Sequence, residues 1–469
     1  MDELVWLPAV ELASAIRRKA ISPVEVTEAI LDRIERLNPT LNAFCLVSHD
    51  VARVAAREAE IAVMRGEPAG PLHGVPVSIK DVLFTRGIAT TGGSRMFEDV
   101  VPTEDSVPVA RLRAAGAVIL GKTNTSELGH KALTTSPLFG STRNPWNPAV
   151  TPGGSSGGAA AAVAAGLGPV ALGTDGGGSI RIPASCCNLY GFKPSHGRVP
   201  NHPGFPGWER FAQAGPLTRT VRDAAIVLDV LAGEDDRDLE SLPAAASDSF
   251  LAACSEGIHG LHVAWAPDLG FARVEPEVLR LCEESAGQFE SLGCHVEVVN
   301  PAWGSPEEAF GTIVSAQFYA AWADRLPQNE PLMDSTLVKF IRRGGGVTTR
   351  QYLEALAWTR NFWLDVHAFL ARFDLLLTPT LAVMPFAAEG PPPREIEGER
   401  VSVLGWMPFT YPFNMTGQPA ASVPTGFTSS ELPVGLQIVG RRNADRTVLA
   451  ASAAYETACP WTSRYPPVD

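Results

Sequence analysis

Two short glycine-rich segments carry the serines that could do chemistry in this sequence. Residues 153–158 read Gly-Gly-Ser-Ser-Gly-Gly, and residues 174–183 read Thr-Asp-Gly-Gly-Gly-Ser-Ile-Arg-Ile-Pro. Glycine lets the backbone approach a ligand closely, because it has no side chain in the way. A serine hydroxyl attacks a carbonyl carbon when a nearby base accepts its proton. The two segments therefore predict a site for acyl transfer, such as the hydrolysis of an amide bond.

Lys80 is the candidate base for such a serine. Val75, Val77 and Ile79 alternate with other residues, which predicts a strand that ends at Lys80. Most lysines are exposed on the surface, so the end of an apolar strand is an unusual place for one. Burial lowers the pKa of a lysine because it disfavours the charged form. A lysine in this position is expected to be partly neutral and able to accept a proton.

A serine elbow of the α/β-hydrolase type is the main alternative for Ser155. Residues 153–157 fit its pattern G-x-S-x-G, which requires a strand directly before it. Residues 143–148 contain two prolines and cannot form that strand. The elbow also needs a histidine and an acid downstream, and none of the candidate histidines has a recognisable setting: His262, His295 and His367. The pattern at Ser155 is weak evidence for an elbow.

Two further patterns are interpreted as structural. Residues 116–123 fit the phosphate-binding motif G-x-x-x-x-G-K-T, but their four central residues are Ala-Val-Ile-Leu, which predict a strand and not a flexible loop. His259 and His262 could bind a metal, but they lie in a predicted strand without an acidic partner. We therefore expect no nucleotide, metal or other cofactor.

The elements that must position these residues alternate between strand and helix. Helices are predicted over residues 23–37, 51–64, 107–114, 159–165, 275–292 and 447–458, and strands over residues 75–79, 117–120, 169–172, 261–265, 295–299, 375–380, 419–424 and 433–440. Asn38-Pro39 is predicted to end the first of these helices. Residues 310–370 are predicted to be mainly helical. This order indicates an α/β protein with a layered sheet.

Composition excludes several classes of protein. The 469 residues carry a net charge of −13, which argues against nucleic acid as the main partner. No apolar run approaches the ~20 residues that span a bilayer, and the acidic start does not resemble an export signal. Seven irregularly spaced cysteines do not predict disulfides. We expect a cytoplasmic protein without a membrane partner.

The motifs together resemble the amidase signature family of serine amidohydrolases. The long pattern that includes both serines is matched over residues 153–183, and the family's lysine strand over residues 74–81. Its other landmarks are matched at residues 121–124, 191–194 and 432–437. The resemblance covers essentially the whole chain. It implies one large α/β/α layered domain, residues 1–469, in which a central mixed twisted sheet is flanked by helices. Residues 74–200 would form its catalytic core and residues 205–410, approximately, its variable, substrate-shaping part.

The resemblance also implies roles for three side chains. Ser179 would be the nucleophile, Lys80 the base and Ser155 the serine that passes the proton between them. In the family the bridging serine follows a cis peptide bond, which here is Gly154–Ser155. No metal or cofactor takes part in this chemistry.

Supporting roles are implied for neighbouring residues. The backbone N–H groups of the second glycine segment would form the oxyanion hole: Gly176, Gly177, Gly178 and Ser179. Ser156 would orient Lys80, whereas Asp175 and Arg181 would brace the loop. The loop near Gly129 would line the substrate pocket.

The sequence departs from the usual family pattern in two places. Gly176 stands where threonine is frequent, which should loosen the loop. Residues 185–188 read Ser-Cys-Cys-Asn, and Asn188 is predicted to adopt a left-handed conformation in place of glycine. Cys186 and Cys187 are expected to be buried and inert.

The implied function is an amidohydrolase that cleaves a carboxylic amide through a serine acyl-enzyme and releases ammonia or an amine. Aromatic residues near 208–211 and 310–407 favour an apolar or aryl acyl group. A carbamate or cyclic-amide hydrolase with the same triad is an alternative, and so is an inactive binding protein with this fold. A transamidation enzyme for charged tRNA is less favoured, because residues 125–130 do not resemble that subgroup. The expected partner is a small amide or carbamate, and the chain could form a homodimer.

Overall fold

One mixed β-sheet runs through the protein. The computed structural model describes residues 3–67, 70–243 and 249–468. Within these ranges eleven strands follow the order β1-β3-β2-β6-β8-β7-β14-β15-β11-β9-β10. They are β1 (Phe44–Val47), β2 (Pro76–Lys80), β3 (Val118–Thr123), β6 (Val170–Asp175), β7 (Tyr190–Lys193), β8 (Gln213–Thr218), β9 (His262–Trp265), β10 (His295–Val298), β11 (Leu375–Pro379), β14 (Ala420–Phe427) and β15 (Pro433–Gly440). Two small hairpins pair β4 (Thr135–Ser136) with β5 (Gly140–Ser141) and β12 (Glu395–Ile396) with β13 (Glu399–Arg400).

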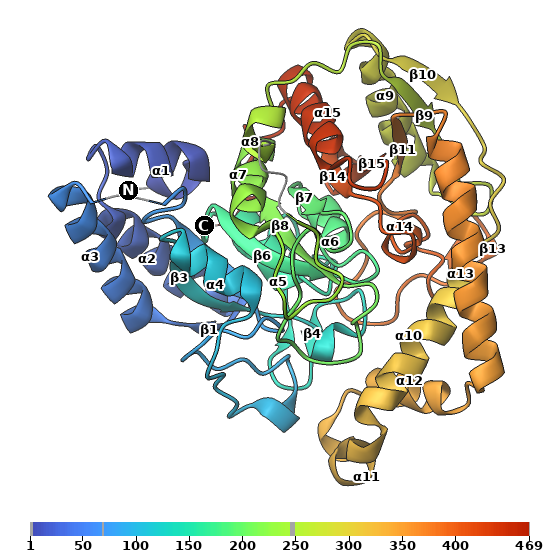
Figure 1. Cartoon of the computed structure of the whole chain (residues 1–469), viewed down its shortest axis with the longest axis horizontal. Helices are drawn as coiled ribbons and strands as arrows, with labels where there is room; N and C mark the ends of the chain where they lie inside the picture. The colour runs from blue at the N-terminus through green and yellow to red at the C-terminus, as the bar shows by residue number, and fades with distance from the viewer. Residues whose placement is uncertain (1–2, 68–69, 244–248, 469) are drawn as a thin grey trace.

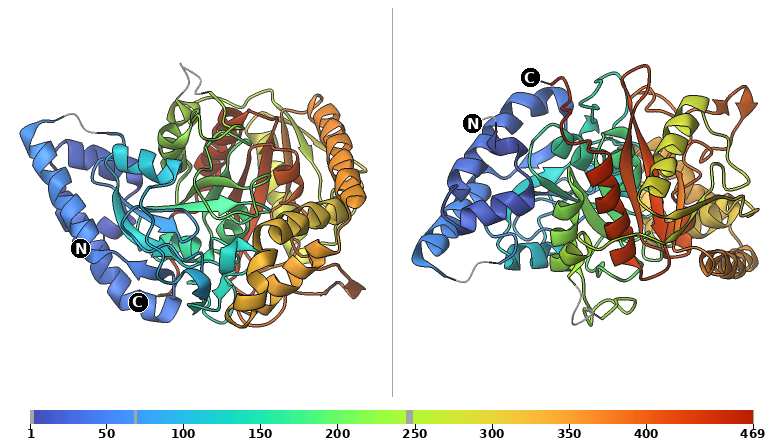
Figure 2. Two further views of the ribbon diagram at one scale, coloured as in Figure 1. Left: turned by 60° about the horizontal axis from the view of Figure 1, so that its bottom comes forward. Right: turned by 90° about the horizontal axis from the view of Figure 1, so that it is seen from above.

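Helices cover both faces and both ends of this sheet (Figure 1). They are α1 (Ala9–Arg17), α2 (Pro23–Leu41), α3 (His49–Arg65), α4 (Val107–Ala114), α5 (Gly157–Ala164), α6 (Arg181–Cys186), α7 (Val221–Leu231), α8 (Phe250–Ala253), α9 (Pro276–Ser291), α10 (Glu307–Trp322), α11 (Leu326–Asn329), α12 (Ser335–Gly345), α13 (Thr349–Leu370), α14 (Pro412–Met415) and α15 (Asp445–Ala458). Helices α1 to α3 lie at one end of the molecule and α10 to α13 at the other (Figures 1 and 2). The predicted α/β layered fold is confirmed. No helix in the described ranges combines the length and the apolar character needed to cross a bilayer.

Two apolar cores hold the layers together. One contains side chains of α7, α9 and α15, and the other contains side chains of α5, α6, α10 and α13. Both include strand residues, because alternate side chains of a strand point to opposite faces of a sheet. The sheet is thus buried on both faces, and the catalytic core segment shares it with the last strands of the chain.

The strands that carry the candidate site are parallel neighbours. β2 pairs with β6, with Val77 opposite Val170 and Ile79 opposite Leu172. Parallel neighbours end at the same edge of a sheet, which is where α/β proteins place their ligands. Lys80 at the end of β2 is thereby brought to the segment that begins at Thr174 on β6.

Most predicted elements are found near their expected positions, but the end of α2 is not. The sequence predicts that Asn38-Pro39 ends this helix, and that prediction is wrong, since α2 continues through Pro39 to Leu41. The helix is closed by Asn42, whose left-handed backbone directs its N–H to the Asn38 carbonyl at 2.8 Å. The Asn38 side chain also accepts the N–H of Phe44 at 2.7 Å, which fixes the turn into β1.

Candidate active site

Lys80 lies at the centre of a buried polar cluster. Its Nζ donates hydrogen bonds to Ser155 Oγ at 2.7 Å and to Thr174 Oγ1 at 2.9 Å. The Lys80 side chain is fully buried, and Thr174 comes from the neighbouring strand β6. A lysine 75 positions before a serine is thus placed in direct contact with it.

The environment of Lys80 favours its neutral form. Burial lowers the pKa of Lys80 to about 7, although the negative charge of Asp175 opposes this shift. An exposed lysine has a pKa of ~10 and is almost fully charged at neutral pH. Lys80 is therefore able to accept a proton under ordinary conditions.

This pKa predicts the pH dependence of catalysis. If the reaction requires neutral Lys80, kcat/KM should rise with pH and level off above about pH 7. Below this value it should fall roughly tenfold per pH unit, because protonation removes the acceptor. Kinetics with an uncharged amide between pH 5 and 9 would measure the profile.

Lys193 provides the control for this profile. Burial, together with the nearby Arg181 charge, lowers the pKa of Lys193 to about 7 as well. Its Nζ donates to the Pro194 carbonyl at 2.8 Å. The Lys193→Met variant should keep the inflection. A profile that is flat from pH 5 to 9 in the wild type, or one that loses its inflection in Lys193→Met, would contradict the assignment to Lys80.

The first serine segment enters the site just before α5. The peptide bond Gly154–Ser155 is cis, as the resemblance implies. Among the described residues no hydrogen bond joins Ser156 to Lys80, so the orienting role predicted for Ser156 would act through Thr174. The Ser156 hydroxyl donates to the Thr174 carbonyl at 3.1 Å and accepts the Thr174 N–H at 3.3 Å. The residue that holds Lys80 directly is Thr174, and Ser156 holds Thr174.

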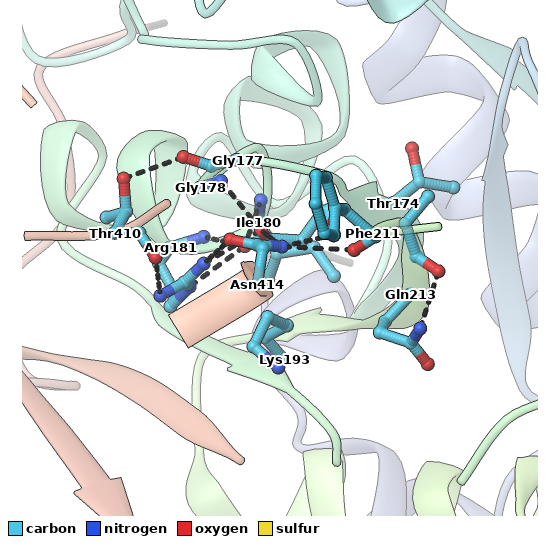
Figure 3. Close-up of polar contacts among 12 residues, drawn as sticks. Thr174, Gly177, Gly178, Ile180, Arg181, Lys193, Phe211, Gln213, Thr410 and Asn414 are labelled. Carbon is cyan, nitrogen blue, oxygen red and sulfur yellow. Dashed lines mark hydrogen bonds and ion pairs between the residues drawn. The ribbon is translucent and has the colours of Figure 1, made fainter. Parts of the chain in front are cut away.

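The second serine segment is braced by a buried ion pair between Arg181 and Asp175. Figure 3 shows Arg181 beside Thr410 and Asn414. Arg181 donates from Nη2 to Asp175 Oδ1 at 2.9 Å and from Nε to Oδ2 at 3.0 Å, and both side chains are fully buried. Arg181 Nη1 also donates to the Thr410 carbonyl at 2.9 Å and to Gln437 Oε1 at 2.7 Å. Asn414 Nδ2 donates to Asp175 Oδ1 at 2.9 Å. This network ties the loop to β15 and to residues 410–414, as the bracing role of Asp175 and Arg181 requires.

Asp175 remains charged within this network. Burial alone would raise the pKa of Asp175, but the Arg181 guanidinium beside it holds that pKa well below the usual range. The permanent negative charge explains why the pKa of Lys80 is not lowered further.

The same carboxylate shapes the loop that precedes Ser179. Asp175 Oδ1 accepts the Gly178 N–H at 2.7 Å, so this donor is not free to face a substrate. The expectation of four oxyanion-hole donors is corrected accordingly. Among the described residues, no hydrogen-bond acceptor is found for the N–H groups of Gly176, Gly177 and Ser179. These three donors are available to an oxyanion.

Two cavities meet at Ser179. The larger has a volume of about 970 Å³, and its wall is mainly apolar, with residues that include Phe310, Val314, Phe340, Trp406 and Met407. The smaller has a volume of about 380 Å³ and is also lined by Ser155 and Thr174. Gly129 lines both, and a Cβ at that position would lie 3.3 Å from Ser155 Oγ. The expected placement of Gly129 in the pocket agrees with this geometry.

The two departures from the family pattern have structural explanations. Asn188 has φ of 57°, which confirms the predicted left-handed conformation. Cys186 and Cys187 are buried, as expected, and burial raises the pKa of both thiols, so neither forms a reactive thiolate. At Gly176 the ring of Trp208 occupies the space that a side chain would need.

Three contributors were missed in the sequence. Thr174 directly precedes Asp175 in the second serine segment, and this position is enough to predict that its side chain lies near the site. Thr410 and Asn414 contact the loop across more than 200 residues, and Thr410 Oγ1 donates to the Gly177 carbonyl at 2.7 Å. No local pattern marks these two residues.

Comparisons with known proteins give matches over nearly the whole chain. The family model Amidase matches residues 25–449. The chain is 39% identical over 471 residues to an acylamidase of Rhodococcus erythropolis, covering 99% of this chain and 98% of that protein. It is 37% identical over 489 residues to a component of the glutamyl-tRNA(Gln) amidotransferase of Moorella thermoacetica, covering 99% of each. A solved bacterial aryl acylamidase, described as an amidase signature enzyme, matches with a TM-score of 0.92 and 37% identity, covering 98% of this chain and 97% of that one.

Proposed function

The chain belongs to the amidase signature family of hydrolases, which act on amide C–N bonds, and we propose that Ser179, Ser155 and Lys80 carry out its reaction. The observation that supports this most is the 2.7 Å hydrogen bond between Lys80 Nζ and Ser155 Oγ. It joins a buried amine of lowered pKa to a hydroxyl that lines the same cavity as Ser179. A serine hydroxyl needs such a base before it can attack a carbonyl carbon.

The first half of the reaction forms an acyl-enzyme. Neutral Lys80 accepts the Ser155 proton while Ser155 accepts the proton of Ser179, and Ser179 Oγ bonds to the carbonyl carbon. The negative charge on the carbonyl oxygen is stabilised by the N–H groups of Gly176, Gly177 and Ser179, a contribution of typically ~3 kcal/mol per donor. The C–N bond then breaks, and the amine leaves with a proton that Lys80 returns through Ser155.

The second half releases the acid. A water molecule replaces the amine, gives up its proton along the same path and attacks the acyl carbon. The bond to Ser179 Oγ breaks, and this oxygen takes its proton back from Ser155. The carboxylic acid and the free enzyme result, and no cofactor is needed.

The larger cavity indicates the class of acyl group. Its mainly apolar wall offers aromatic and aliphatic surface beside Ser179, including Phe310, Trp406 and Met407, although Lys131, Glu307, Glu308, Arg343 and Arg394 also line the cavity. Burial of apolar surface contributes ~25 cal/mol per Å². We therefore propose that the substrates are small amides with an apolar or aryl acyl group. The net charge of −13 gives no support for tRNA as a substrate.

A substrate panel tests this proposal. Primary amides, anilides and carbamates with matched phenyl-bearing, alkyl and carboxylate-bearing acyl groups are to be compared by kcat/KM. Apolar and aryl acyl groups are expected to exceed charged ones of the same length by at least about tenfold. Preference for a charged acyl group would overturn the assignment of the larger cavity. Faster hydrolysis of carbamates than of the matched amides would favour a carbamate hydrolase.

A further inference from the structure

One large side chain, that of Trp208, lies where the two cavities meet. Gly129, Ser179 and Trp208 are the lining residues that both cavities share. Ser179 is the proposed nucleophile and Gly129 has no side chain, so Trp208 supplies the one large side chain among the three residues at which the cavities meet. Its position therefore determines how a substrate can lie across the nucleophile.

Trp208 is held in this place from several sides. Its Nε1 donates to the Leu128 carbonyl at 3.2 Å, and its ring meets that of Phe318 edge to face at a centroid distance of 5.5 Å. The loop before it is fixed as well, because Trp322 Nε1 donates to the Pro206 carbonyl at 3.1 Å. Edge-to-face aromatic pairs stabilise one orientation of the ring. The indole of Trp208 is therefore held in one position and orientation.

The Trp208 ring fits in this position only because residue 176 is glycine. A Cβ at position 176 would lie 2.5 Å from Trp208 Cε3, which is closer than two carbon atoms can approach. The threonine that is frequent in the family at this position would displace the indole. The glycine and the tryptophan are therefore one structural unit, in contact with the proposed oxyanion hole.

The position of Ser155 assigns the two halves of the substrate. Ser155 and Thr174 line the smaller cavity but not the larger one. In the proposed mechanism Ser155 returns the proton to the leaving nitrogen, so this nitrogen must face the smaller cavity. The acyl group, on the other side of the carbonyl carbon, then extends into the larger cavity.

The charges around the smaller cavity agree with this assignment. Its wall carries three carboxylates, of Glu209, Asp238 and Glu240, together with Arg237 and two histidines, of which His196 lies 2.7 Å from Glu240. Arg237 forms ion pairs with Asp235 and Glu104. A predominantly acidic wall favours a leaving group that becomes an ammonium ion, because opposite charges attract.

We propose that Trp208 is the specificity-determining residue that separates a large apolar site for the acyl group from a smaller acidic site for the amine. Gly176 leaves the space that the Trp208 ring needs. This assignment of the two sites rests on the proposed function, since it uses the role of Ser155. The substrate class that follows is an amide with an extended apolar acyl group and a small basic amine.

Two isomeric amides test the partition. In 4-phenyl-N-methylbutanamide the phenyl chain is on the acyl side, and in N-(3-phenylpropyl)acetamide it is on the amine side. The wild type should hydrolyse the first with a kcat/KM at least about tenfold higher. In the Trp208→Ala variant this ratio should fall by at least about tenfold, because the two spaces join. A wild-type preference for the second amide, or an unchanged ratio in the variant, would overturn the proposal.

Matched substitutions fill one cavity at a time. A Cβ at Gly204, which lines the smaller cavity, would meet no atom within 4 Å. Gly204→Phe should therefore slow mainly the amide with the large amine. Val403 lines the larger cavity and is 47% exposed, so Val403→Phe should slow mainly the amide with the large acyl group. The opposite pattern, or equal effects on both amides, would contradict the assignment.

The contact between Gly176 and Trp208 is tested by a double-mutant cycle. Gly176→Ala should lower kcat/KM, because its Cβ displaces the indole. In the Trp208→Ala background the new Cβ meets no ring, so the fold-decrease in kcat/KM caused by Gly176→Ala should be at least about tenfold smaller than in the wild type. An equal loss in both backgrounds would show that the contact does not matter.

Binding measurements test the separation of the two sites independently of the proposed catalytic roles. Both amides can be titrated by calorimetry into the Ser179→Ala protein, with and without Gly204→Phe or Val403→Phe. Gly204→Phe should weaken binding of the amine-extended amide, and Val403→Phe that of the acyl-extended one. This pattern supports the partition even if the catalytic roles are wrong, and its absence overturns the partition even if turnover by Ser179 is established.

Discussion

The Ser179→Ala variant is expected to lose at least about 10⁴-fold in kcat while it keeps the fold. The substitution removes the atom that forms the bond to the acyl carbon, and a nucleophile of a serine hydrolase typically accounts for this much or more. Little structural effect is expected, because the described contacts of Ser179 are made by its backbone, including the carbonyl that accepts the Ser156 N–H at 3.2 Å. Steady-state kinetics and thermal unfolding of both proteins would measure the two effects.

A contaminating amidase is the main risk in this measurement, so residual activity needs a control. The kcat of the variant should be measured on protein from two independent purifications. A fluorophosphonate probe should be added to each to detect any contaminating serine hydrolase. Turnover within about tenfold of the wild type, with Ser179 replaced and the fold intact, would show that another residue is the nucleophile.

Lys80→Met is expected to lower kcat by about 10³-fold or more. Methionine has a similar length but accepts no proton, so Ser155 loses the base at 2.7 Å. A general base contributes typically 10²–10⁴-fold, and here the same group also supplies the proton for the leaving amine. The loss should be accompanied by loss of the inflection near pH 7. Kinetics from pH 5 to 9 would measure both.

The same variant should change how stability depends on pH. An unfolded lysine keeps its proton up to a pH near ~10, whereas burial lowers the pKa of Lys80 to about 7 in the fold. The unfolded state therefore binds more protons between these values, and this makes the wild type more stable as pH rises through that window. Lys80→Met removes this contribution, so its Tm relative to the wild type should be highest at pH 7 and below.

Lys122 offers a matched control for Lys80. It is also fully buried, one strand away on β3, and burial lowers the pKa of Lys122 to about 8. Its Nζ donates to Thr85 Oγ1 at 2.8 Å and Thr90 Oγ1 at 3.0 Å, and not to Ser155. Lys122→Met should lower Tm, because it leaves buried groups without a donor, with far less effect on kcat. If both variants lost activity equally, burial of a lysine in this sheet would matter more than its role as a base.

Local patterns predict much of this fold. Alternating apolar residues identify β2, a continuous apolar run identifies β11, and α4 is found at the predicted residues 107–114. The strands β7 and β8 were not predicted, since they contain Gly191, Gly215 and Pro216, which are unfavourable in isolated strands. Pairing with β14 and β6 stabilises them in the sheet. Such pairing cannot be deduced from composition alone.

Part of the candidate site could be predicted from the sequence and part could not. Lys80, Ser155 and Ser179 stand out by type and by context, and the resemblance to a known family joins them. The contacts that orient them do not stand out, because side-chain direction depends on packing across the chain. Ser156 shows this difference, since its hydroxyl forms a hydrogen bond with Thr174, and it is Thr174 that forms one with Lys80. Trp208 shows it as well, since its role depends on the space left by Gly176.

The measurement that tests the central claim most directly is the identification of the acylated residue. The wild type is to be treated with a fluorophosphonate, or with a slowly hydrolysed phenyl-bearing carbamate, and the modified peptide identified by mass spectrometry. We predict one adduct for each chain, located on Ser179, with loss of activity in proportion to labelling and no adduct in Ser179→Ala. An adduct on Ser155, or inactivation without modification of Ser179, would contradict the account.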